Sequence, residues 1–190
     1  AIEAGPADFE TRLQAFAAAG GAGANVTLPL KALAAELATS LGERAQRVGV
    51  ANTLVRTDEG WHADNTDGIG LVRDLTDRHR LDLRERRTLI VGAGGGARGI
   101  APALLDAGIG ELFIVNRTPE RADALADMLG QPSRVRARYL GDVAAFGEFD
   151  LVINATSATR GGTLAPLPRA IVGRRTAAVD LSYGEAAIPF

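Results

Sequence analysis

The sequence predicts an α/β fold whose larger part is a doubly wound parallel sheet. Beyond residue 87, short apolar runs typical of buried strands alternate with amphipathic segments typical of helices. Strands that alternate with helices in this way favour a parallel sheet covered by helices on both faces. Strands are expected at 88–91, 112–115, 135–139, 151–154 and 177–181, with helices at 97–107, 119–129 and, in a short form, 142–146.

The first 66 residues are expected to form a separate, partial α/β lobe. Leucine and phenylalanine at helical spacing predict its helices, and apolar runs bounded by Pro29 or by a hairpin turn at 58–60 predict its strands. Helices are expected at 7–19, from Lys31 through Leu41, and from a cap at 64–67 through Leu75, with strands at 25–28, 48–55 and 61–63. The chain therefore divides into a first lobe, 1–66, and a second domain, 67–190.

Composition excludes several classes of protein. The 190 residues are 46% apolar and carry a formal net charge of -2, so the chain can bury a core and lacks a general nucleic-acid footprint. The absence of cysteine excludes disulfides and thiolate metal sites and fits the cytoplasm, where thiols stay reduced. No apolar run approaches the roughly 20 residues of a membrane helix. We expect no metal, no nucleic-acid partner and no membrane association.

Lysine is nearly absent from the chain. Of the 21 basic residues only Lys31 is a lysine, although lysine is normally among the commonest residues. A general preference for arginine explains the other positions and leaves open why position 31 kept a lysine.

A glycine-rich loop follows the first strand of the second domain. The segment Gly92-Ala93-Gly94-Gly95-Gly96-Ala97 satisfies Gly-x-Gly-x-x-Gly/Ala and leads into a helix. Such a loop lets backbone approach a pyrophosphate, which the helix N-terminus attracts. The pattern predicts a Rossmann-type dinucleotide-binding domain.

The end of the next strand distinguishes between the two nicotinamide cofactors. Cofactors with a free ribose 2′-hydroxyl are usually held there by an acidic residue. This sequence has instead Asn116, Arg117 and Thr118, followed by Arg121. Guanidinium groups suit a 2′-phosphate, and positive charge at a helix start favours an anion nearby. NADP is therefore the expected cofactor, and Ala155, Thr156 and Ser157 after the fourth strand can line its nicotinamide half or form a simple loop.

Three polar clusters lie at junctions between elements of the first lobe or beside it. They are Asn25, Thr27 and Lys31; Asn52 and Thr53; and Asn65, Thr66 and Asp67. A lysine beside a carboxylate can move a proton to and from a hydroxyl while a nicotinamide carries the hydride. On the pattern alone, Lys31 can equally be a solvated residue at a helix start and Asp67 only a helix cap.

The order of these motifs resembles the shikimate dehydrogenase family along essentially the whole chain. The matching segments are Asn25–Lys31, Val50–Leu54, Asp64–Gly70, Gly92–Gly99, Asn116–Thr118 and Asn154–Ser157. The resemblance implies reversible, NADPH-dependent reduction of 3-dehydroshikimate to shikimate in chorismate and aromatic amino acid biosynthesis, by a monomer or homodimer. It also implies that Lys31 is the acid–base residue and Asp67 its partner.

The same resemblance implies the binding residues. Thr27, Asn52 and Asp67 would hold the substrate's hydroxyls, with Tyr183 approaching after the fifth strand. Arg117, Thr118 and Arg121 match the family's 2′-phosphate clamp.

The resemblance also implies that parts of the family's substrate site lie outside residues 1–190. The family begins with a strand and a Ser-x-Ser segment that grips the substrate carboxylate, and it continues past 190 with a substrate-contacting glutamine. Because the chain starts at Ala1 and stops at Phe190, we expect an internal piece of a longer protein with an incomplete first lobe. The alternatives are a relative that oxidises quinate or uses NAD, and a non-catalytic nucleotide-binding relative.

Overall fold

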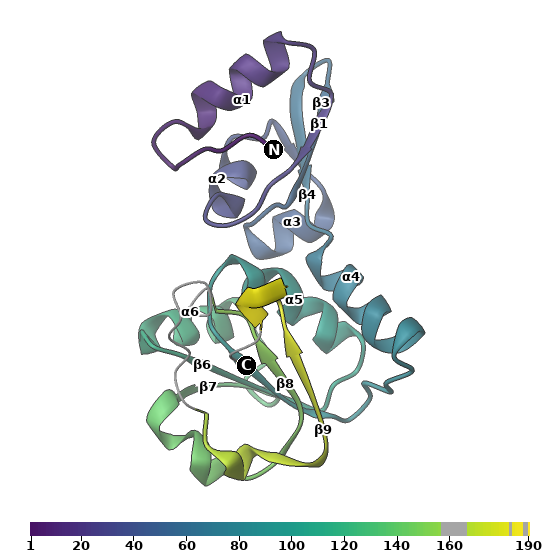
Figure 1. Cartoon of the computed structure of the whole chain (residues 1–190), viewed down its shortest axis with the longest axis vertical. Helices are drawn as coiled ribbons and strands as arrows, with labels where there is room; N and C mark the ends of the chain where they lie inside the picture. The colour runs from purple at the N-terminus through teal and green to yellow at the C-terminus, as the bar shows by residue number, and fades with distance from the viewer. Residues whose placement is uncertain (157–166, 183, 188–189) are drawn as a thin grey trace. The chain divides into compact units, whose positions relative to one another are not determined.

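The computed structural model describes residues 1–156, 167–182, 184–187 and 190. It consists of two compact units, unit 1 (Ala1–Gly70) and unit 2 (Leu71–Phe190). In Figure 1 the colour runs along the chain from purple at the N-terminus, in unit 1, to yellow at the C-terminus, in unit 2. Ser157 and Tyr183, two of the expected site residues, lie outside the described residues.

Unit 1 contains a four-stranded sheet in the order β1-β3-β4-β2. β3 pairs antiparallel with β1 and β4, whereas β2 runs parallel to β4. The core forms where helices and sheet pack together, with Phe9, Leu13, Leu54 and Trp61 among its buried residues. The elements of this unit are α1 (Phe9–Ala18), β1 (Gly23–Asn25), α2 (Lys31–Glu36), β2 (Ser40–Leu41), α3 (Glu43–Val48), β3 (Thr53–Thr57) and β4 (Gly60–Asp64).

Three expectations for unit 1 were wrong. The strand expected at 25–28 ends at Asn25, because β1 is Gly23–Asn25 and the amide of Leu30 donates to the carbonyl of Thr27 (2.9 Å) in a turn. The helix that starts at Lys31 ends at Glu36, because the Thr39 amide donates to the carbonyl of Trp61 (2.9 Å) and the chain joins the sheet. The strand expected from Val48 begins only at Thr53. Val48 instead ends α3, a helix that sequence reasoning missed, and Gly49 (φ 65°) terminates it in the left-handed conformation.

Unit 2 confirms the doubly wound parallel sheet. Its five strands are all parallel, in the order β7-β6-β5-β8-β9. Each face carries its own apolar core, one with Ile90 and Ile114 and the other with Leu89 and Phe113. The elements are α4 (Asp67–Arg73, beginning in unit 1), η1 (Asp74–Arg78), β5 (Arg87–Val91), α5 (Gly95–Asp106), β6 (Glu111–Asn116), α6 (Pro119–Leu129), β7 (Val135–Tyr139), η2 (Leu140–Phe146), β8 (Phe149–Asn154), η4 (Arg169–Ile171), β9 (Val172–Asp180) and η5 (Gly184–Ala187).

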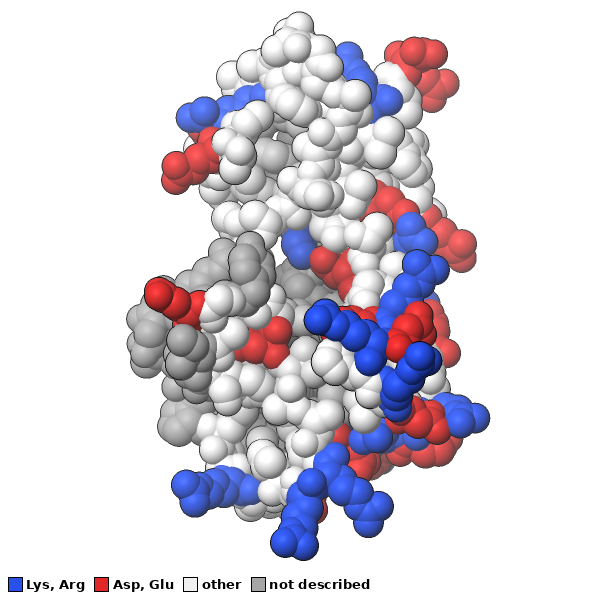
Figure 2. All heavy atoms as spheres, turned by 45° about the vertical axis from the view of Figure 1, so that its right-hand side comes forward, with Lys and Arg blue, Asp and Glu red and all other residues white. Residues whose placement is uncertain are grey.

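The surface carries charges of both signs. On the face shown in Figure 2, blue and red side chains lie beside one another along the right-hand side of the lower half. Within the described ranges, no helix combines the length and apolarity needed to cross a bilayer. The same residues contain no group of three or more His, Cys, Asp or Glu placed to hold a metal ion.

Candidate functional site

Backbone hydrogen bonds bring the three polar clusters of unit 1 together. The amide of Val26 donates to the carbonyl of Asn52 (2.7 Å), and the amide of Ala51 donates to the carbonyl of Lys31 (2.8 Å). The amide of Asn52 in turn donates to the carbonyl of Asp64 (3.1 Å). The 50–53 segment therefore lies between the start of α2 and the segment that leads into α4.

Lys31 and Asp67 form a close ion pair at this junction. Lys31 Nζ lies 2.6 Å from Asp67 Oδ2, and the two side chains are only 13% and 23% exposed. Asn52 Nδ2 donates to the other carboxylate oxygen, Oδ1, at 2.8 Å. Asp67 is the first residue of α4, where the helix dipole favours a negative charge. The carboxylate is thus held by two donors from two different segments.

Asn65 fixes the start of α4, and sequence reasoning assigned it no role of its own. It is 2% exposed, donates from Nδ2 to the carbonyl of Val50 (3.0 Å), and accepts the amide of Asp67 on Oδ1 (3.0 Å). This side chain sets the position of Asp67 relative to the segment that carries Asn52. A signal was present, since asparagine two residues before a helix start can accept its first amides.

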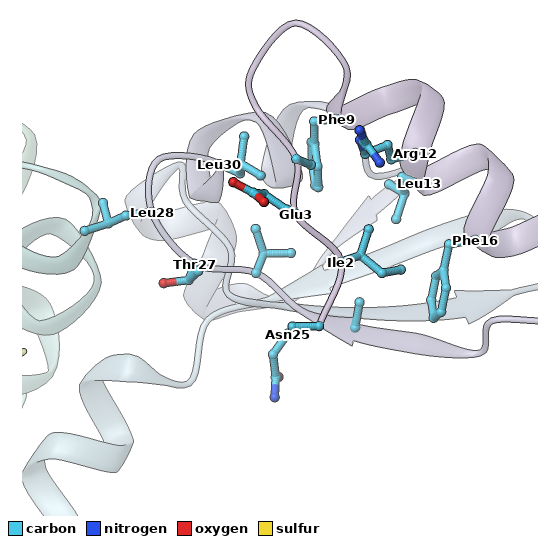
Figure 3. A pocket seen from close by; sticks show the side chains of 14 residues that line it. Ile2, Glu3, Phe9, Arg12, Leu13, Phe16, Asn25, Thr27, Leu28 and Leu30 are labelled. Carbon is cyan, nitrogen blue, oxygen red and sulfur yellow. The ribbon is translucent and has the colours of Figure 1, made fainter. Parts of the chain in front are cut away.

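Thr27 lies at the rim of an apolar pocket of about 490 Å³ in unit 1. Figure 3 shows the side chains of Thr27 and Asn25 pointing away from the wall formed by Phe9, Leu13 and Leu30. Lys31, Asn52 and Asp67 do not line this pocket. Thr27 and Asn25 therefore line the pocket, whereas the Lys31–Asp67 pair and Asn52 lie outside it.

The glycine loop of unit 2 connects β5 to α5 as predicted. Gly92 has φ 113°, and a β-carbon there would lie 2.9 Å from the carbonyl carbon and oxygen of Ala155. Gly94 caps α5 in an extended conformation, and a β-carbon on it would meet nothing within 4 Å. The first amides of a helix have no partner inside the helix. The structure therefore leaves open space beside Gly94, at the start of α5.

Arg117 lies between β6 and α6, and Arg121 lies in the first turn of α6, next to Glu120. Asn116 Nδ2 donates to the carbonyl of Thr118 (2.8 Å), and Thr118 caps α6. Arg117 and Arg121 are both exposed beside this cap. Two cations at a helix start can bind an anion such as a phosphate monoester.

The segment after β8 packs against the glycine loop. Besides the close approach of Ala155, a β-carbon at Gly92 would lie 3.2 Å from Cγ2 of Thr156. Ala155 also donates its amide to the carbonyl of Val91 (2.8 Å). The structure thus places Ala155 and Thr156 beside Gly92, at the edge of the sheet where ligands bind in such folds.

Comparisons with known proteins cover both units. The family model "Shikimate dehydrogenase substrate binding domain" matches residues 1–54, and "Shikimate / quinate 5-dehydrogenase" matches residues 74–165. The curated shikimate dehydrogenase (NADP(+)) of Xanthomonas oryzae pv. oryzae is 60% identical over 193 residues, covering 100% of this chain and 68% of the relative.

Solved structures agree with the family models. An Ael1 enzyme from Pseudomonas putida is 42% identical with a TM-score of 0.85, covering 97% of this chain and 67% of that one. Shikimate 5-dehydrogenase from Thermus thermophilus, solved in complex with NADP(H) and shikimate, is 33% identical with a TM-score of 0.77, covering 94% and 64%. Matched in sequence and in fold along its length, the chain belongs to the shikimate dehydrogenase family.

Proposed function

We propose that this protein catalyses the reversible, NADPH-dependent reduction of 3-dehydroshikimate to shikimate. The observation that carries the proposal is the half-buried Lys31–Asp67 pair, with 2.6 Å between Nζ and Oδ2. Relatives at 58–60% identity are named shikimate dehydrogenase (NADP(+)). The reaction belongs to chorismate and aromatic amino acid biosynthesis, and a chain without cysteine is suited to the cytoplasm.

In this proposal the two parts of the protein bind different ligands. Residues 1–66, together with Asp67, hold the substrate, and residues 67–190 hold NADP. The ring hydroxyls of the substrate bind Thr27, Asn52 and Asp67, with Tyr183 as a further contact. Buried polar groups of this kind reject analogues that lack the hydroxyl, because the protein group would then lose its partner.

Lys31 supplies and recovers the proton. When bound, NADPH supplies the hydride that reduces the C3 carbonyl carbon. Lys31 Nζ donates a proton to the carbonyl oxygen as that oxygen becomes a hydroxyl, and accepts it back in the reverse direction. Asp67 holds the ammonium group in place through Oδ2, while Asn52 holds the carboxylate through Oδ1.

NADP is held by three segments of unit 2. The pyrophosphate binds at Gly92–Ala97, where the structure leaves room beside Gly94. The 2′-phosphate binds Asn116, Arg117, Thr118 and Arg121. Ala155, Thr156 and Ser157 are assigned to the nicotinamide half of the cofactor.

Steady-state turnover of shikimate and of quinate, each with NADP and with NAD, tests this function. The account predicts that shikimate with NADP has the highest kcat/KM. A preference for NAD would contradict the role of Arg117 and Arg121, and a preference for quinate would contradict the substrate assignment. A folded protein that binds NADPH but turns over neither substrate would instead be a non-catalytic relative. Sedimentation of the same sample separates a monomer from a homodimer.

A further inference from the structure

We propose that Asn154 is a positioning residue that holds two segments against the glycine loop and so sets the affinity for NADP. The inference rests on the proposed function but concerns a side chain without an assigned role. Asn154 is the last residue of β8 and is fully buried, with 0% exposure. Among the described residues, the buried polar side chains are Asn65, Thr88 and Asn154.

The side chain of Asn154 connects two loops through its two ends. Oδ1 accepts the amide of Thr156 (3.1 Å) and its hydroxyl Oγ1 (2.8 Å). Nδ2 donates to Asp180 Oδ2 (2.8 Å) at the end of β9, directly opposite Asn154 in the parallel register. Asp180 Oδ1 accepts the amide of Ser182 (2.7 Å). One chain of hydrogen bonds therefore runs from Thr156 through Asn154 and Asp180 to Ser182.

The two loops that these hydrogen bonds connect both pack against the glycine loop. Ala155 and Thr156 would contact a β-carbon at Gly92 at 2.9 and 3.2 Å. Leu181, between Asp180 and Ser182, would contact a β-carbon at Gly96 at 3.4 Å through Cδ1. A shift in either loop therefore presses on the pyrophosphate cradle or opens it. Asn154 need not touch the cofactor, because it acts through these neighbours.

The polarity of the pair makes a sharp test possible. Asn154→Asp would place two carboxylate oxygens at the Asn154–Asp180 contact, where like charges repel. Asp180→Asn would place an amide group either against Nδ2 of Asn154 or against the amide of Ser182, so one bond is lost. The double variant, Asn154→Asp with Asp180→Asn, exchanges donor and acceptor and keeps the net charge. It allows every hydrogen bond between Thr156 and Ser182 in this network to form again.

The experiment measures the dissociation constant of NADPH by fluorescence titration, below the melting temperature of each variant. Each single variant is expected to weaken NADPH binding about tenfold or more, because a buried hydrogen bond to a charged group is lost. The double variant should return to within about threefold of the original protein. At saturating NADP, KM for shikimate should change little.

Two outcomes would overturn the proposal. Single variants that melt earlier but bind NADPH as tightly as the original protein would give Asn154 a purely structural role. A double variant that binds NADPH no more tightly than the weaker-binding single variant would show that residues 154 and 180 do not act together on NADPH affinity. If the single variants do not fold, Asn154→Ser decides, since its shorter side chain cannot reach both neighbours. A tenfold weaker affinity of Asn154→Ser for NADPH supports the positioning role, and an unchanged affinity overturns it. An original protein that fails to bind NADPH or to turn over shikimate refutes the proposed function instead.

Discussion

Lys31 is both the single lysine of the sequence and the partner of Asp67 in the candidate site. A preference for arginine accounts for the other basic residues of the chain, whereas position 31 keeps a lysine. Arginine cannot release its proton in a protein, and lysine can. The structure places this lysine 2.6 Å from Asp67, and the proton transfer proposed for Lys31 would explain the exception.

At the same scale, we propose that Arg117 and Arg121 determine the preference for NADP over NAD. Replacing both with alanine should weaken NADP binding at least tenfold and leave NAD binding nearly unchanged, because only NADP carries the 2′-phosphate. The measurement is the pair of dissociation constants. Arg174→Ala is the matched control, since Arg174 is an exposed arginine near the amino end of β9, away from the carboxyl edge. Equal losses for NADP and NAD would contradict the clamp.

At the scale of elements, the start of α4 positions Asp67 in the candidate site. Asn65 links the carbonyl of Val50 to the amide of Asp67, so the helix begins at a fixed place relative to Asn52. Both linked groups are backbone groups that need partners when they are shielded from water. A single buried side chain therefore couples the stability of unit 1 to the geometry of the Lys31–Asp67 pair.

Asn65→Ala should lower the free energy of unfolding by about 1–3 kcal/mol, since buried backbone groups lose their partners. It should also lower kcat while leaving the affinity for NADPH unchanged, because Asp67 is no longer fixed. Denaturant unfolding and steady-state kinetics measure the two effects. Gln46→Ala, on the exposed side of α3, is the control and should change neither. Full activity in the folded Asn65→Ala variant would show that Asp67 is positioned by other contacts.

The elements of unit 2 were far easier to predict than those of unit 1. The bounds of β7 and α6 agree with the sequence-based ranges, because an alternation of apolar and basic residues is typical of a half-exposed strand, and an amphipathic helix that ends at Gly130 has a clear pattern. In unit 1, α3 has only six residues, and the predicted strand over 48–55 joined the end of α3 to the start of β3. Short elements are defined by tertiary hydrogen bonds, such as Thr39 to Trp61, which no local pattern contains.

For the whole molecule, the order of motifs predicted the family and the fold, but burial and hydrogen-bond partners required the structure. The sequence placed Lys31 and Asp67 in one site by resemblance, and the structure adds that Asn52 holds the second carboxylate oxygen. Asn154 could not be identified as a connecting residue, because its partner Asp180 lies on a strand 26 residues later. Long-range pairs between neighbouring parallel strands depend on register, which the sequence does not specify.

The central claim is that Lys31 transfers the proton while NADP takes or gives the hydride. The direct measurement is kcat for shikimate oxidation by Lys31→Arg, together with its affinity for NADPH and its melting temperature. The account predicts that kcat falls about 10²-fold or more, while the fold, the affinity for NADPH and the positive charge beside Asp67 are retained. A folded Lys31→Arg variant with kcat close to that of the original protein would contradict it.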